Sequence, residues 1–180
     1  MNIETKKYKT EDERFIGENT NMIYVDAPYY DFLIIKDKNK QNSNDIKLEI
    51  MQTERNHQGS SSRERGRPRI LFRIRKGRWL KHFEADYITA VIKTRIFYGE
   101  VTKINEYIKD NIPESVIEKS YLSWSGGGRK AYLRCGTNLL ESLGLLKSIS
   151  ISNAHKLEEL IREEYEPKDR TLNPTLNYAK

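Results

Sequence analysis

The sequence predicts an α+β fold in which a small antiparallel β-unit is followed by a helical unit. Apolar and polar residues alternate in the first half of the 180-residue chain, as they do in half-buried strands. In the second half, apolar residues recur with the spacing of amphipathic helices. An apolar fraction of 37% and a charged fraction of 32% are sufficient for one core of ordinary size.

A flexible tail and then the β-unit, over residues 21–82, are expected at the N-terminal end. Residues 1–20 are polar and show little periodicity, which is typical of a tail. Residues 22–36 are rich in Tyr, Ile, Val and Phe but contain Pro28, which predicts two short strands. Residues 45–52 alternate between apolar and charged side chains and predict a further strand.

Another strand is expected over residues 69–80, where the alternation returns. We predict that it pairs with the strand over residues 45–52 as an antiparallel hairpin. Residues 53–69 would then form a long basic arm at the hairpin tip. On the outer face, this pairing would bring Lys47 and Glu49 opposite Arg73 and Arg75.

The helical unit is expected over residues 83–166, with a polar tail over residues 167–180. The apolar spacing predicts helices over residues 83–99, 101–111, 114–124, 129–143 and 154–165. Gly144 suits the left-handed position that ends a helix. Residues 145–152 alternate and predict a short strand before the last helix.

The net charge of +6 is concentrated in one segment. Residues 63–81 contain nine cations and one anion, so this segment carries +8 and the rest of the chain carries −2. Seven of the cations are Arg, which binds phosphate in a bidentate manner. A polyphosphate backbone neutralises such a run and releases counterions, whereas the alternative is a solvated cationic surface. We therefore predict a nucleic-acid partner bound by Arg63, Arg65, Arg67, Arg69, Arg73, Arg75, Lys76 and Arg78.

The order of elements over residues 100–152 resembles that of winged helix-turn-helix proteins. Two helices are followed by a glycine-rich turn at Gly126-Gly127-Gly128, a further helix and a strand. The segment from Arg129 to Lys147 is similar to the recognition helix and first wing strand of that superfamily. The resemblance implies an α+β protein with a winged-helix-like unit that binds DNA, often as a homodimer, or that binds protein instead. It implies major-groove contacts from Ser125, Arg129, Lys130 and Arg134.

The basic arm carries a second resemblance. Arg65-Gly66-Arg67-Pro68 resembles the core of the AT-hook, which lies extended in the minor groove of A·T-rich DNA. A general phosphate-binding arm is the alternative interpretation.

A catalytic alternative rests on two carboxylates. Pro28-Tyr29-Tyr30-Asp31, followed by Glu49 on the next expected strand, resembles the Mg²⁺-binding arrangement of restriction-type nucleases. That pattern requires Lys or Gln two residues after the Glu, where this chain has Met51. We therefore predict binding rather than catalysis, with no catalytic residue, metal or cofactor. The single Cys135 excludes an intrachain disulfide and a multi-cysteine zinc site.

The sequence as a whole predicts a non-enzymatic DNA-binding protein in transcription regulation, replication or genome organisation. An RNA-binding or ribosome-associated protein is the first alternative, and a Mg²⁺-dependent nuclease is the second. No apolar run is long enough to cross a membrane, and the N-terminus lacks a signal-peptide core. We accordingly expect no membrane partner and a cytoplasmic, nucleoid or nuclear location.

Overall fold

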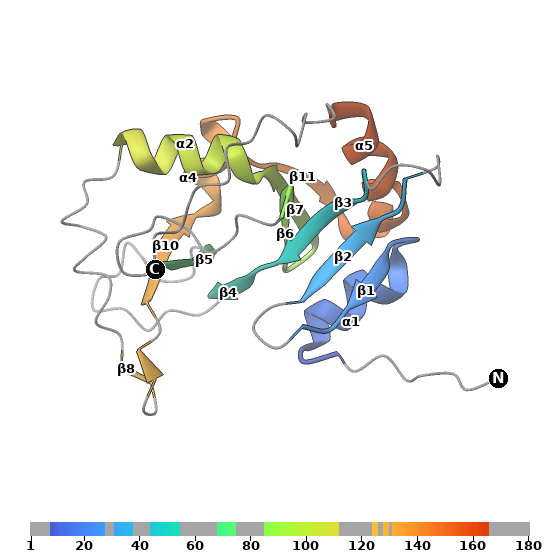
Figure 1. The fold of residues 1–180 in the computed structure, drawn as a ribbon, viewed down its shortest axis with the longest axis horizontal. Coiled ribbons are helices and arrows are strands. Elements are labelled where there is room, and N and C mark those ends of the chain that lie inside the picture. The colour runs from blue at the N-terminus through green and yellow to red at the C-terminus, as the bar shows by residue number, and fades with distance from the viewer. Residues whose placement is uncertain are drawn as a thin grey trace.

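The computed structural model describes residues 8–27, 31–37, 44–54, 68–74, 85–111, 124–125, 128–129 and 131–165, and over these it is a mixed α+β fold (Figure 1). The main sheet has six strands in the order β1-β2-β3-β6-β7-β11. Their bounds are Ile23–Val25, Phe32–Ile35, Ile46–Ile50, Tyr87–Ile92, Arg95–Glu100 and Lys147–Ser150. The α+β class is thus confirmed.

One face of the main sheet packs on helices from both ends of the described chain. These helices are α1 (Glu11–Asn19), the 3₁₀ helix η2 (Ile151–Lys156) and α5 (Leu157–Glu164). Their buried residues Ile16, Ala154, Leu157 and Ile161 form one core with Leu33, Leu48 and Ile96 of the sheet. This core fixes the position of the N-terminal helix on the sheet.

The other face packs on helices α2 (Val101–Asn111) and α4 (Thr137–Ser142) and on a smaller sheet. The smaller sheet has the order β10-β5-β4, with bounds Ala131–Gly136, Arg69–Ile74 and Gln52–Glu54. A separate two-stranded unit consists of β8 (Trp124–Ser125) and β9 (Gly128–Arg129). The main sheet therefore lies between two layers of different composition.

Strands from both halves of the chain share the main sheet. β3 pairs with β6 in parallel, whereas the other pairs in the described sheets are antiparallel. β4 and β5 occur in the chain between these two parallel strands. The boundary that we expected at residue 82 therefore divides a single sheet.

Several expected elements are confirmed. The two short strands around Pro28 are β1 and β2, and the strand expected over residues 45–52 corresponds to β3 with the start of β4. The second expected helix is α2. Gly144 has the expected left-handed conformation, with a φ of +70°.

The expected N-terminal tail is wrong over residues 11–19, which form α1. Thr10 and Glu13 form a capping box, in which each side chain accepts a hydrogen bond from the other's backbone N–H. Ile16 is fully buried against the main sheet. The single buried face is short, which explains why the periodicity is weak in so polar a segment.

The expected helix over residues 83–99 is also wrong, because β6 and β7 form a hairpin there. All six residues of β6 are buried. Its sequence therefore lacks the apolar–polar alternation by which a strand is distinguished from a helix. The turn at Lys93 and Thr94 joins Ile92 and Arg95, which pair directly. Its Lys93 has a φ of +56°.

The expected helix over residues 129–143 divides into a strand and a short helix. Residues 131–136 are β10, and the helical conformation begins only at Thr137, in α4. Backbone pairing with β5 overrides the helical spacing of the leucines in this segment. A recognition helix that begins at Arg129 is therefore wrong.

The remaining expected elements are one strand pairing, the last strand and helix, and the helix over residues 114–124. The strand at residues 69–74 pairs with β4 and β10 rather than with β3, so the expected pairing of Lys47 and Glu49 with Arg73 is wrong. Arg75, the other expected partner, lies outside the described residues. The strand expected over residues 145–152 is confirmed as β11. The last helix, expected over residues 154–165, is confirmed as α5, with the 3₁₀ helix η2 directly before it. The helix expected over residues 114–124 lies outside the described residues except for Trp124, which is in β8.

Candidate nucleic-acid interface

The smaller sheet brings together two cationic segments that are far apart in the sequence. β5 and β10 are antiparallel over six residue pairs, from Arg69 opposite Gly136 to Ile74 opposite Ala131. Arg73 is opposite Tyr132, and Arg134 is opposite Leu71. The sequence predicts Arg73 in the strand over residues 69–80 and Arg134 in a separate recognition helix. The register makes them neighbours in one sheet.

Both segments lack acidic residues over long stretches. There is no Asp or Glu between Glu64 and Glu84, or between Glu118 and Glu141. In sequence, Ile74 is followed by Arg75 and Lys76, whereas Ala131 is preceded by Arg129 and Lys130. Because Ile74 and Ala131 pair, the two cationic runs begin at the same end of the sheet.

The core holds this sheet in place. Ile70 and Phe72 are almost fully buried, and Cys135, opposite Ile70, is 7% exposed. Burial raises the pKa of the Cys135 thiol to about 11, so the thiol is protonated at neutral pH. The neutral thiol packs as a small apolar group. Alternation leaves half-buried Arg69 and Leu71 on the opposite face of β5.

The basic arm begins and ends in this sheet. β4 and β5 pair antiparallel with Glu54 opposite Arg69. The ends of the arm expected over residues 53–69 therefore belong to these two strands, and the arm that connects them is residues 55–68. The carbonyl of Pro68 accepts a hydrogen bond of 3.2 Å from the backbone N–H of Thr137, at the start of α4. The end of the arm is therefore attached to the helix that follows β10.

The structure describes five of the twelve predicted binding residues, namely Arg69, Arg73, Ser125, Arg129 and Arg134. All five lie in the smaller sheet or in the β8–β9 unit. The other seven lie outside the described residues, and these are Arg63, Arg65, Arg67, Arg75, Lys76, Arg78 and Lys130. The AT-hook-like segment is outside as well, except for Pro68.

The two carboxylates of the nuclease hypothesis point to opposite faces of the main sheet. Phe32 is directly opposite Glu49, and Phe32 belongs to the core under α2 and the smaller sheet. Directly opposite residues share a face, and consecutive residues alternate, so Asp31 points to the other face. Both side chains are buried, with Asp31 2% and Glu49 3% exposed. They therefore do not form one two-carboxylate site.

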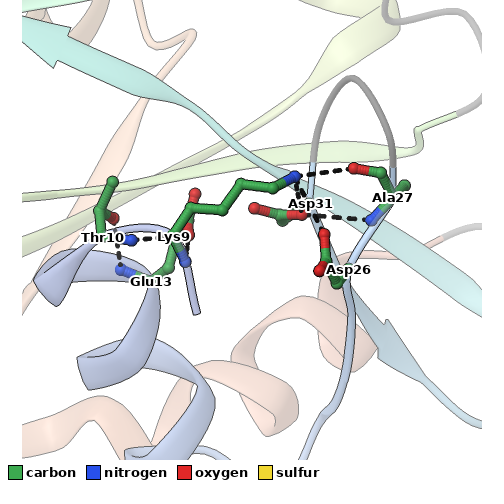
Figure 2. A network of polar contacts seen from close by, with 6 residues as sticks. All are labelled: Lys9, Thr10, Glu13, Asp26, Ala27 and Asp31. Atoms are coloured by element: carbon green, nitrogen blue, oxygen red, sulfur yellow. Dashed lines mark hydrogen bonds and ion pairs between the residues drawn. The ribbon is translucent and has the colours of Figure 1, made fainter. Parts of the chain in front are cut away.

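Asp31 instead belongs to a polar network with the N-terminal segment (Figure 2). Its Oδ1 accepts hydrogen bonds from Lys9 Nζ at 2.9 Å and from the backbone N–H of Ala27 at 3.2 Å. Lys9 Nζ also donates to the carbonyl of Ala27 at 2.8 Å and lies 3.0 Å from Asp26 Oδ1. Glu13 accepts from the backbone N–H groups of Lys9 and Thr10. The network ties residues 9–13 to the β1–β2 connection.

The pKa values in the network differ in direction. Burial would raise the pKa of Asp31, but hydrogen bonds from Lys9, Glu13 and Ala27 outweigh it and lower that pKa. Burial and the adjacent Asp31 raise the pKa of Glu13. Burial also raises the pKa of Tyr24, which hydrogen-bonds to Asp31. At neutral pH, Asp31 is thus the charged partner of Lys9.

Sequence reasoning missed the role of Lys9 and Glu13. The spacing Thr10-x-x-Glu13 is a capping-box signature and could have indicated the helix start. Nothing in the sequence indicated that Lys9 reaches Asp31, because that contact depends on how α1 packs.

In the part of the chain that the structure describes, no group of three or more His, Cys, Asp or Glu residues is arranged to hold a metal ion. None of the helices in the described ranges has the length and apolarity needed to span a membrane.

Comparison with known proteins found no matching family model, no matching curated protein and no matching solved structure.

Proposed function

We propose that the protein binds nucleic acid through the basic β-surface, which we define as β5, β10 and the β8–β9 unit with the arm over residues 55–68. The observation that carries this proposal is the register of β5 and β10. It makes Arg73 and Arg134 members of one antiparallel sheet whose flanking sequences contain many cations and no acids. Cations from separate segments that lie in one sheet can neutralise several phosphates of the same polyanion.

This proposal replaces a helix with strands as the binding element. Residues 131–136 are a strand, so contacts from Arg129 and Arg134 come from a β-surface and not from the expected recognition helix. Antiparallel strands also bind nucleic acid, either in the grooves of duplex DNA or as a surface for single strands. Duplex DNA and RNA therefore both stay candidate ligands.

The proposed mechanism is stoichiometric binding driven by phosphate neutralisation. The arginines contact phosphates, and the displaced counterions supply the driving force. The arm over residues 55–68 adds contacts where its arginines reach the backbone of the ligand. A role in transcription regulation, replication or genome organisation is consistent with such binding.

A salt series tests the proposal. Binding of labelled duplex DNA, single-stranded DNA and RNA oligonucleotides of equal length is measured by fluorescence anisotropy at several salt concentrations. We expect log K to fall linearly with log salt for at least one of them, with a slope that reports the number of neutralised phosphates. A flat line, or no binding at low salt, would contradict the proposal.

A further inference from the structure

The β8–β9 unit is a hairpin that stands apart from the two larger sheets. Trp124 pairs with Arg129, and Ser125 pairs with Gly128. In sequence, only Gly126 and Gly127 separate the two strands, and Gly-Gly is a preferred composition for a two-residue hairpin connection. Figure 1 shows β8 beyond the end of β10, away from the helices. A narrow hairpin thus extends the basic β-surface.

A hairpin this short gains little stability of its own. Two strands of two residues make few backbone hydrogen bonds, and isolated two-stranded hairpins are marginally stable in water. A bound partner would add contacts to the hairpin. The sequence indicates the chemistry of this partner. Trp124 is paired with Arg129, and the surrounding stretch contains no acidic residue.

Nucleic acid fits this pairing. An indole stacks on the flat face of a base, while a neighbouring guanidinium contacts the phosphate next to that base. In the chain, only Lys130 separates β9 from β10. A nucleic-acid strand that is bound along β10 would therefore reach the hairpin. In a duplex, the base faces are already stacked on their neighbours, so indole stacking requires an unpaired base.

We infer that Trp124 stacks on an unpaired base of nucleic acid bound at the basic β-surface, with Arg129 on the adjacent phosphate. This inference rests on the proposed function and adds a substrate class to it. The preferred ligand has single-stranded segments, as single strands, loops or junctions do, and a fully paired duplex binds through its phosphates alone.

Tryptophan fluorescence tests this inference directly. The chain has two tryptophans, so Trp79→Phe leaves Trp124 as the only indole. This variant is titrated with an oligothymidylate and with a blunt duplex of equal length, while anisotropy of labelled copies reports binding independently. We expect the oligothymidylate to quench the emission of Trp124 and the duplex to leave it nearly unchanged.

The variant Trp124→Ala gives a second readout. We expect its affinity for oligothymidylate to fall about 5- to 150-fold, the range that corresponds to the loss of one base stack, and its duplex affinity to fall by a much smaller factor. Trp124→Phe should recover part of the loss, since phenylalanine also stacks. Circular dichroism confirms that each variant is folded.

The outcomes separate the two proposals. Oligothymidylate binding without quenching in the Trp79→Phe variant, or an equal loss for both ligands in Trp124→Ala, overturns the stacking inference alone. No binding of either ligand, by anisotropy at low salt, overturns the proposed function and the stacking inference with it.

Discussion

The ammonium of Lys9 lies 2.9 Å from Oδ1 of Asp31, whose side chain is 1% exposed. This ion pair joins the segment before α1 to the start of β2 (Figure 2). A carboxylate buried to this extent needs a charged or hydrogen-bonding partner. Lys9 supplies that charge, and it explains why a polar N-terminal segment packs on the sheet.

We expect Asp31→Asn to lower the free energy of unfolding by about 1.5–3 kcal/mol, the usual range for a hydrogen bond to a charged group. The substitution removes the charge that faces Lys9 while it preserves the shape of the side chain. Urea denaturation at neutral pH measures the effect.

Asp26→Asn is the matched control for that variant. Asp26 also contacts Lys9, but its side chain is 42% exposed. Exposed ion pairs contribute about 0–1 kcal/mol, so this variant should stay close to the parent protein. Equal destabilisation by the two variants would contradict the central role of Asp31.

Glu13→Gln should alter how stability depends on pH. Burial and the adjacent Asp31 raise the pKa of Glu13, so its protonated form is favoured in the folded state. A raised pKa contributes stability at low pH, and this contribution is lost as pH rises through the folded-state pKa. Gln is neutral at every pH, and its amide can both accept and donate as protonated Glu13 does.

The ordinary pKa of glutamate is about 4.3, so Glu13 is protonated below pH 4 and ionised in the unfolded chain at pH 7–8. The variant should therefore be more stable than the parent at pH 7–8 and should differ little from it below pH 4. Denaturation curves at both pH values measure the difference. A gain that is independent of pH would show that the Glu13 charge is not its cause.

Gly99→Ala tests the packing of β7 beneath the segment that leads to β11. A Cβ at Gly99 would meet the backbone carbonyl oxygen of Leu145 and lie 2.8 Å from Leu146 Cδ2. Since backbone must move, we expect a loss of about 1–3 kcal/mol. Gly136→Ala is the control, because no atom lies within 4 Å of its added Cβ. Thermal denaturation of both variants should separate them clearly.

Lys93→Gly should stabilise the β6–β7 hairpin. Lys93 has a φ of +56°, a left-handed conformation that costs an ordinary residue about 1–2 kcal/mol. Glycine adopts it freely, although it loses more entropy on folding, so we expect a net gain below about 1 kcal/mol. Thr94→Gly, at the next turn position, should give no gain.

The sequence predicted β3 from its alternation, and β1 and β2 from their apolar composition and the interruption at Pro28. The helix α2 follows its apolar spacing. The sequence-based prediction failed at β6, because a strand buried on both faces has no alternation to read. It failed at β10, because that strand exists through pairing with β5, about sixty residues earlier in the chain.

The candidate interface was predictable in its composition but not in its geometry. The sequence alone indicates the cations of residues 63–81 and those of Arg129 and Arg134. The pairing that puts Arg73 and Arg134 in one sheet depends on strand register, which no local pattern encodes at such a separation. The same limit applies to Asp31 and Glu49, since the sheet turns them to opposite faces.

The most direct test of the central claim compares two variants that lose equal charge. Arg73→Gln, Arg129→Gln and Arg134→Gln together remove three cations from the basic β-surface. Arg14→Gln, Lys103→Gln and Lys109→Gln remove three exposed cations from α1 and α2. Both variants have the same net charge, so the position of the cations is the variable.

Binding of the oligonucleotide with the highest affinity for the parent is measured across a salt series for all three proteins. We predict that the slope of log K against log salt falls by about 2–3 for the basic β-surface variant, roughly one for each lost phosphate contact. The control variant should keep the parental slope. An equal change in both variants, or no change in the first, would contradict the account.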